Sequence, residues 1–228
     1  MKNAQDLNSR YSTEELCARI LERHRARIKV RKQQLVLANL SRIVTAFLRL
    51  SNRKGYHAMS LRELADESGL SMGALYTYFD SKEMLLVMVV GEVANTMSEV
   101  LASVPEETRQ DPRAHMYWLI DTHIRLTETM QQWFVFVFME TKSFPRSVRQ
   151  AAVDSETLAE QELAEIIERG NAAGVFDVED PQLFAAMVKP LLQDWYVKRA
   201  KYRRRKVGID RYIEQVTNVI ERAACSKT

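Results

Sequence analysis

The residues with the clearest chemical potential lie close together, in the segment SMGALYTYFDSKE, residues 71–83. Gly73 and Ala74 are small enough to let a helix backbone approach another surface closely. Three nearby side chains carry groups that hydrogen-bond phosphate oxygens: Tyr76, Tyr78 and Lys82. The N-terminus of a helix that begins after Ser71 would add a favourable field toward negative charge. The segment therefore predicts a contact with phosphates.

Catalytic and metal-binding chemistry have little support in the sequence. Neither a glycine-rich phosphate loop nor a nucleophile elbow is present. The chain has four histidines, none with metal-ligand spacing: His24, His57, His115 and His123. The glutamates between residues 156 and 168 are spaced as on a solvated helix face. We therefore expect no enzyme activity, no metal and no cofactor.

The composition is that of a globular, helix-rich protein. Of 228 residues, 46% are apolar and 28% are charged, with only seven glycines and five prolines, which favours an all-α fold over a disordered chain. We find no signal peptide, and no uninterrupted run of about twenty apolar residues that could span a membrane. Cys17 and Cys225 lie near opposite ends, which argues against a disulfide framework. We expect a cytoplasmic protein with free thiols.

Charge is distributed unevenly along the chain. Residues 1–82 carry 15 Lys and Arg against 8 Asp and Glu, residues 83–197 carry 8 against 19, and residues 198–228 carry 10 against 3. Because an acidic surface repels phosphates, a nucleic-acid contact should fall in the first or the last of these segments.

Two short helices are predicted to position the phosphate-binding segment. Ser60 and Glu63 have the spacing of a capping box, which opens the helix LRELADES that ends at Gly69. Ser71 is a good N-cap for a second short helix, MGALYTYF, and a third helix begins with Lys82.

Longer helices are predicted on both sides of this pair. Residues 12–54 are predicted to form one helix with few breaks, which begins after the cap in STEE and stops at Gly55. The helix from Lys82 has one apolar face and stops near Pro105. Later helices are expected to begin near residues 112, 145, 181 and 209, and WFVFVFM, residues 133–139, is interpreted as a short buried helix.

Two short capped helices joined by a glycine-containing turn have the form of a helix-turn-helix. Residues 60–86, SLRELADESGLSMGALYTYFDSKEMLL, resemble the DNA-binding domain of the TetR family of bacterial transcriptional regulators. The matching residues follow the family pattern in order: Ser60, Leu64, Ala65, Gly69, Leu70, Ser71, Gly73, Leu75, Tyr76, Tyr78, Phe79, Ser81, Lys82, Glu83 and Leu85. The resemblance is specific over about residues 36–90.

The resemblance implies an all-α, TetR-like architecture in three parts. Residues 1–35 would be a basic N-terminal helical extension, residues 36–82 the three-helix DNA-binding domain, and residues 83–228 a larger helical domain for ligand binding and dimerisation. The extension is a departure from the family pattern. Its segment HRARIKVRK, residues 24–32, is either an arm along the DNA backbone or a solvated extra helix.

The resemblance also implies roles for individual residues. Expected phosphate contacts are Ser60, Tyr76, Tyr78 and Lys82, and expected positions at or near base edges are Arg62, Met72, Gly73, Ala74 and Thr77. Ser71, the N-cap of the second short helix, is also expected to belong to the DNA-binding surface. Arg62 alone in the second set could read guanine with two hydrogen bonds, although it is equally well interpreted as an exposed surface charge. Because the second short helix has few hydrogen-bonding side chains, we expect DNA shape to supply much of the specificity.

The remaining helices would bind the effector and a second subunit. The last two helices of the family pair in a four-helix bundle, and the apolar residues expected there are Leu183, Met187, Leu191, Ile213, Val216 and Ile220. Candidate pocket residues are Met116, Trp118, His123, Met130, Trp133, Phe134, Phe138, Met139 and Trp195, although each taken singly is more readily interpreted as a core residue. The chain is thus predicted to be a homodimeric repressor of a palindromic operator, released by a small hydrophobic effector such as an aromatic or lipid-like molecule or an acyl-CoA.

A second basic segment, KRAKYRRRK, has seven positive charges in residues 198–206. We interpret it first as the solvated end of the penultimate helix, then as a site for an anionic ligand such as the phosphates of coenzyme A, and last as a DNA contact. The alternative function for the whole chain is a helical scaffold that binds a protein partner without recognising an operator.

Overall fold

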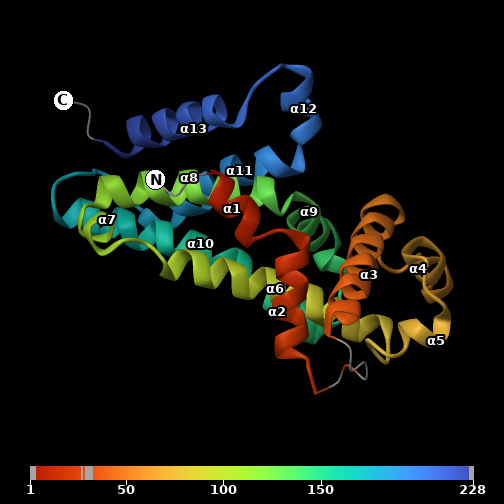
Figure 1. Cartoon of the computed structure of the whole chain (residues 1–228). Coiled ribbons are helices and arrows are strands. Elements are labelled where there is room, and N and C mark those ends of the chain that lie inside the picture. Colours follow the sequence, from red (N-terminus) through yellow and green to blue (C-terminus); the bar gives the residue numbers. More distant parts are fainter. Residues whose placement is uncertain (1–3, 27, 29–32, 226–228) are drawn as a thin grey trace. The chain divides into compact units, whose positions relative to one another are not determined.

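The fold is described from a computed structural model, which defines residues 4–26, 28 and 33–225 (Figure 1). Its helices are α1 (Ala4–Arg10), α2 (Thr13–Arg23), α3 (Gln33–Lys54), α4 (Leu61–Ser68), α5 (Met72–Leu75), α6 (Lys82–Ala102), α7 (Glu106–Gln110), α8 (Pro112–Thr129), α9 (Gln131–Glu140), α10 (Arg146–Ala172), α11 (Pro181–Val197), α12 (Arg199–Arg204) and α13 (Ile209–Ala224), with a 3₁₀ turn, η1, at Thr141–Ser143. No strand occurs among the described residues, and the predicted all-α class is confirmed.

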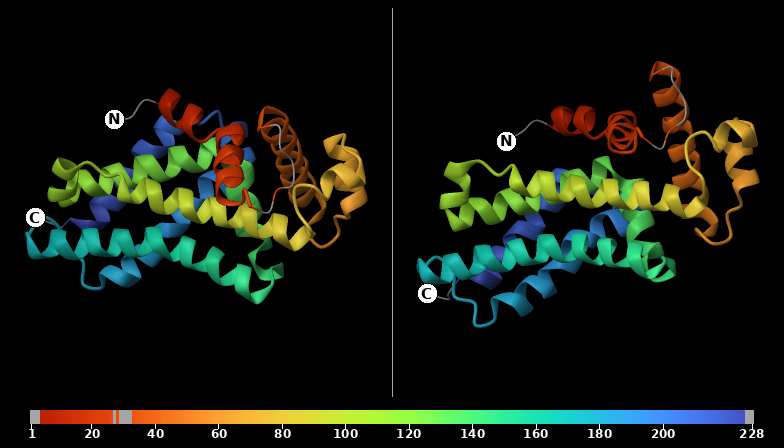
Figure 2. Two further views of the ribbon diagram at one scale, coloured as in Figure 1. Left: turned by 60° about the horizontal axis from the view of Figure 1, so that its bottom comes forward. Right: turned by 90° about the horizontal axis from the view of Figure 1, so that it is seen from below.

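The chain folds as two compact units that do not follow the order of the sequence. Unit 1 comprises residues 1–95 and 129–153, and unit 2 comprises residues 96–128 and 154–228. Helices α6 and α10 each contribute residues to both units. Within unit 1, α3, α4 and α5 lie side by side in every view (Figures 1 and 2).

The N-terminal segment of unit 1 differs from the single helix predicted for residues 12–54. The predicted cap at Ser12 is confirmed, because its hydroxyl accepts a hydrogen bond from the amide of Glu15 at 3.3 Å. The continuous helix is wrong, since α2 ends at Arg23 and α3 begins at Gln33. Most of HRARIKVRK lies outside the described residues.

Helix α2 is folded onto its unit. Its inward face buries four side chains: Leu16, Cys17, Ile20 and Leu21. Burial raises the pKa of the Cys17 thiol to about 12, so this cysteine remains a neutral thiol in the core. Arg23 near the end of α2 forms an ion pair with the buried Glu92 of α6, which fixes α2 against that helix.

Helix α6 is long and apolar enough to span a membrane by length and composition, although it is not an uninterrupted apolar run. It has 21 residues and a mean hydropathy of 1.5 over its most apolar window. Because 61% of that window is buried inside the protein, packing against neighbouring helices accounts for its apolar character.

Several predicted helix starts are confirmed by their caps. The carboxylate of Asp111 accepts hydrogen bonds from the amides of Arg113 and Ala114 at 2.9 and 3.2 Å. The carboxylate of Asp180 accepts one from the amide of Leu183 at 2.9 Å and so caps the start of α11. The segment WFVFVFM is helical, as predicted, and four of its side chains are buried: Trp133, Phe134, Phe136 and Val137.

We expect Gly170→Ala to destabilise unit 2. Gly170 lies in the last turn of α10, and a Cβ added there would overlap the ring of the buried Phe176. Displacing that ring should cost about 1–3 kcal/mol, a loss of several degrees in melting temperature. The control is Gly91→Ala in α6, where an added Cβ meets no described atom within 4 Å. Because alanine has a higher helix propensity than glycine, this variant should gain about 0.5–1 kcal/mol in the free energy of unfolding. Equal melting temperatures for the two variants would contradict this account.

Candidate functional site

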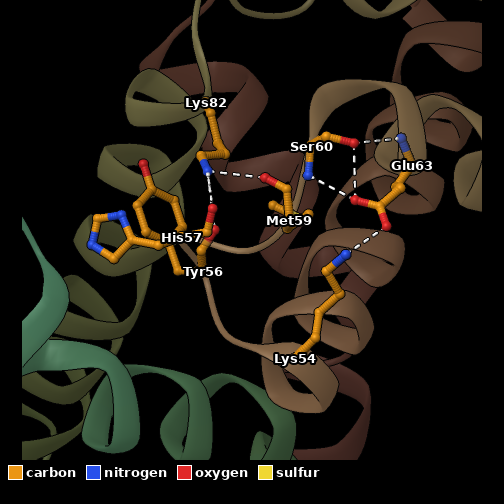
Figure 3. A network of polar contacts seen from close by, with 7 residues as sticks. All are labelled: Lys54, Tyr56, His57, Met59, Ser60, Glu63 and Lys82. Atoms are coloured by element: carbon orange, nitrogen blue, oxygen red, sulfur yellow. Dashed lines mark hydrogen bonds and ion pairs between the residues drawn. The ribbon is translucent and has the colours of Figure 1, made fainter.

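The candidate site begins with the capped helix α4. The hydroxyl of Ser60 accepts a hydrogen bond from the amide of Glu63 at 3.2 Å, and the Glu63 carboxylate accepts from the Ser60 amide at 2.9 Å. The predicted capping box is therefore confirmed. The bond from Lys54, at 2.5 Å, and those from Ser60 lower the pKa of Glu63 to about 2. This network ties α3 to the start of α4 (Figure 3).

The turn after α4 has the predicted form, but the helix that follows is shorter than predicted. Gly69 takes the left-handed conformation, with φ of 65°, that glycine adopts most easily at a helix end. Ser71 then caps α5 by accepting a hydrogen bond from the amide of Ala74 at 3.2 Å. Helix α5 stops at Leu75. Beyond it the backbone continues in a narrower 3₁₀-type turn, in which the amides of Thr77 and Tyr78 donate hydrogen bonds to the carbonyls of Ala74 and Leu75, three residues earlier.

Lys82 stabilises the site by hydrogen bonds to the loop between α3 and α4. Its ammonium donates hydrogen bonds to the carbonyls of Tyr56 and Met59 at 3.0 Å each and of His57 at 3.4 Å (Figure 3). It also lies 4.5 Å from the centroid of the Tyr56 ring. In this structure Lys82 therefore joins the α3–α4 loop to the start of α6, whereas the sequence suggested that it faces phosphate.

The two tyrosines of the segment lie in different environments. Tyr76 is 44% exposed, whereas Tyr78 is only 1% exposed. The prediction that both hydroxyls lie on the rim is thus wrong for Tyr78 in this structure, because its ring belongs to the core of unit 1. The hydroxyl of Ser60 is exposed but already donates to the Glu63 carboxylate at 2.9 Å.

The other predicted DNA contacts form an exposed or half-exposed surface on α4 and α5, which we call the α5 rim. Its exposed members are Gly73 on α5, the two capping residues Ser71 and Tyr76 at the ends of α5, and Arg62 on α4, and its half-exposed members are Met72, Ala74 and Thr77. Thr77 donates its hydroxyl to the carbonyl of Ala74 at 2.6 Å. The α5 rim therefore contains the predicted DNA contacts that are accessible to a binding partner.

Three supporting contacts were not predicted from the sequence. Arg42 of α3 donates to the carbonyl of Gly69 at 3.0 Å and so holds the helix-turn-helix turn. Glu140 at the end of α9 accepts from the amide of Tyr56 at 3.0 Å, and His57 lies 2.7 Å from the carbonyl of Ser143. Because the last two contacts join residues more than 80 positions apart, no local pattern reveals them.

The predicted dimer residues divide between an exposed row and the core. Leu183, Met187 and Leu191 of α11 are 56%, 68% and 37% exposed. The three residues predicted from α13 are buried inside the chain: Ile213, Val216 and Ile220. They form the inner face of α13, and burial within one subunit accounts for all three side chains. Val219 is a large apolar residue of α13 that is exposed, at 57%.

The predicted pocket residues are divided between the two units. Met130, Trp133, Phe134, Phe138 and Met139 belong to unit 1, and Met116, Trp118, His123 and Trp195 belong to unit 2. Phe138 and Met139 are 38% and 59% exposed, which contradicts their prediction as interior residues.

Trp195 has a structural role. Its ring is fully buried with its centroid 5.3 Å from that of Tyr202 and 4.8 Å from that of Tyr212, and its Nε1 donates to Glu128 at 2.9 Å. It therefore joins α11, α12 and α13 to α8.

The basic segment 198–206 forms its own short helix, α12, and does not simply end the penultimate helix. Arg199 donates three hydrogen bonds of 2.9, 3.0 and 3.1 Å to the carboxylate of Glu128, and Lys198 and Lys201 pair with Asp194. The other four cations of the segment are exposed: Arg203, Arg204, Arg205 and Lys206.

Comparison with known proteins gives the family of the chain. Residues 43–89 match the family model described as "Bacterial regulatory proteins, tetR family", and residues 109–221 match "Tetracyclin repressor-like, C-terminal domain". The transcriptional repressor KstR of Mycobacterium tuberculosis is 29% identical over 101 residues, which are 42% of this chain and less than half, 46%, of KstR.

Solved structures agree with this assignment. The TetR family regulator PfmR of Thermus thermophilus has 26% identity and a TM-score of 0.64, covering 79% of this chain and 97% of PfmR. The regulator FadR of Bacillus subtilis, solved in complex with stearoyl-CoA, has 17% identity and a TM-score of 0.58, covering 78% and 96% of the two chains, and shows a shared fold. With its helix-turn-helix and both halves matched, the chain belongs to the TetR family of DNA-binding transcriptional regulators and is not an enzyme.

Proposed function

We propose that this regulator is a cytoplasmic repressor that binds a palindromic operator as a homodimer and is released by a small hydrophobic effector. The observation that carries the DNA contact is the α5 rim, where Gly73 and Tyr76 are exposed. A Cβ at Gly73 would meet no atom of the described chain within 4 Å, so the chain's own packing does not require glycine there. Close approach to DNA does require a small residue. The relative KstR is named a repressor, which supports the same sign of regulation.

The exposed row of α11 supports a homodimer. Leu183, Met187 and Leu191 recur at intervals of four, which places them on one face of the helix. A row of large apolar side chains in water is unfavourable unless a partner covers it. In a homodimer with twofold symmetry, the same row of a second copy would pack against this one. The twofold symmetry of the dimer would match a near-palindromic operator.

An effector is proposed for unit 2, which combines a large apolar interior with a few polar groups. The structural neighbour FadR is complexed with stearoyl-CoA, so an acyl-CoA is one member of the class we propose. The exposed cations Arg203–Lys206 could then meet the phosphates of coenzyme A.

The rim account is tested by a matched pair of variants, Tyr76→Phe and Tyr78→Phe. Tyr76→Phe should weaken binding to the DNA upstream of the chain's own gene about three- to tenfold, because it removes one phosphate hydrogen bond of about 1 kcal/mol. Tyr78→Phe should leave affinity unchanged, because that ring is buried. Fluorescence anisotropy of labelled DNA, with and without a panel of hydrophobic metabolites and acyl-CoAs, measures both binding and release.

Two results would contradict the proposal. Wild-type protein that fails to bind this DNA above its affinity for random sequence would favour the scaffold alternative. Equal losses in Tyr76→Phe and Tyr78→Phe would show that the tyrosines contact DNA in a conformation different from the one described.

A further inference from the structure

Helix α11 turns an unusual polar face toward the interior of unit 2. Lys189 and Gln193, one helical turn apart, are 6% and 9% exposed, and Tyr196 on the next turn is 4% exposed. Their neighbours Val188 and Leu192 are buried apolar residues. A lysine is rarely buried to this extent unless an anion accompanies it.

The described residues provide no direct counter-ion for Lys189. Its single hydrogen bond is to Nε2 of His123 on α8, at 3.4 Å, and it makes no ion pair in the described part of the chain. One carboxylate of unit 2, that of Glu156 on α10, already accepts a hydrogen bond from the Gln193 amide at 2.6 Å. Glu156 and Glu160 act on Lys189 only at longer range, and burial lowers its pKa to about 8.

His123 provides a second hydrogen-bond donor without an acceptor among the described residues, at its Nδ1. A lysine ammonium has no acceptor, so in this pair Nε2 of the imidazole must accept. Burial, and then the charge of Lys189, lower the pKa of His123 well below its ordinary value, so the ring is neutral and its proton is on Nδ1. His123 is 3% exposed, and its Nδ1 has no hydrogen-bond partner among the residues that the structure describes. Lys189 and His123, on facing helices, therefore both have donors without acceptors in this part of the chain.

We propose that Lys189 and His123 form the polar end of the effector site in unit 2, and that the effector is an apolar carboxylic acid. A single ammonium beside a neutral imidazole balances one negative charge. A dianionic phosphate would retain an uncompensated charge near Glu156 and Glu160. This inference rests on the proposed function, because it names the chemical class of the effector assigned there to unit 2, and within that class it selects a free carboxylic acid over a coenzyme A thioester.

The test compares the full-length protein with Lys189→Met and Lys189→Gln by thermal denaturation without DNA. If Lys189 awaits a ligand, both variants should melt at or above the wild-type temperature, because they remove an uncompensated buried charge. If Lys189 instead stabilises the fold through Glu156 and Glu160, both should melt lower. The control is Lys142→Met, which changes an exposed lysine of η1 and should have no effect.

The ligand class is tested on the same proteins with decanoate and 4-ethylbenzoate, each beside its neutral primary amide. At least one carboxylate should raise the wild-type melting temperature in a concentration-dependent way, and its amide should not. Affinity for that carboxylate should fall about ten- to a hundredfold in Lys189→Met, because a charge-assisted bond is lost.

Three results would overturn the inference: no shift with either carboxylate, equal shifts with carboxylate and amide, or unchanged carboxylate affinity in Lys189→Met. Operator binding is measured separately by anisotropy. If wild-type protein binds the carboxylate but no DNA, the proposed function fails while the assignment of this site remains. If it binds DNA but no carboxylate, the site assignment fails while the proposed DNA-binding function remains.

Discussion

Lys82→Met is expected to lower both the melting temperature of the protein and its affinity for operator DNA. The ammonium of Lys82 is bonded to three carbonyls of the α3–α4 loop, and a methionine leaves all three without that donor. The loss should be about 1–3 kcal/mol, or several degrees. Because the loop leads directly into α4, the α5 rim would lose its fixed position, and operator affinity should fall about tenfold or more.

The salt dependence of binding separates this anchoring role from a direct phosphate contact. A lysine that neutralises a phosphate contributes about one unit to the slope of log affinity against log salt, and its removal reduces the slope. Lys82→Met should weaken binding with the slope unchanged. The exposed Lys142→Met is the control for both measurements. A reduced slope with an unchanged melting temperature would return Lys82 to the phosphate-binding set.

The parts of the site that were predicted correctly are those set by local geometry. Ser60 and Glu63 are three residues apart, and Gly69 and Ser71 lie at a helix end and a helix start, so each acts within its own turn. The partners of Lys82 lie 23–26 positions earlier in the chain. Only the folded backbone brings them together, and the sequence therefore suggested a solvent-facing role for Lys82.

The differences at Tyr78 and α13 have a related cause. Residues two apart on a helical turn point to nearly opposite sides, so Tyr76 and Tyr78 could not both lie on the rim. The apolar stripe of α13 was recognised, but a stripe does not reveal whether its own chain or a second subunit covers it. Here Val216 and Ile220 face the interior and Val219 faces outward.

Gly73→Ala is expected to separate folding from DNA recognition most sharply. Gly73 is exposed, and an added Cβ would meet no atom of the described chain within 4 Å. Alanine also favours a helix by up to about 1 kcal/mol over glycine, so the melting temperature should stay the same or rise. At a surface pressed against DNA, the same methyl group must be accommodated between helix and base edges, which should weaken operator binding about ten- to a hundredfold. Anisotropy and thermal denaturation on one preparation measure both effects, with Gly91→Ala as the control that is stabilised without losing affinity. Unchanged affinity in Gly73→Ala would mean that the backbone of α5 does not approach the operator closely and that recognition lies elsewhere on unit 1.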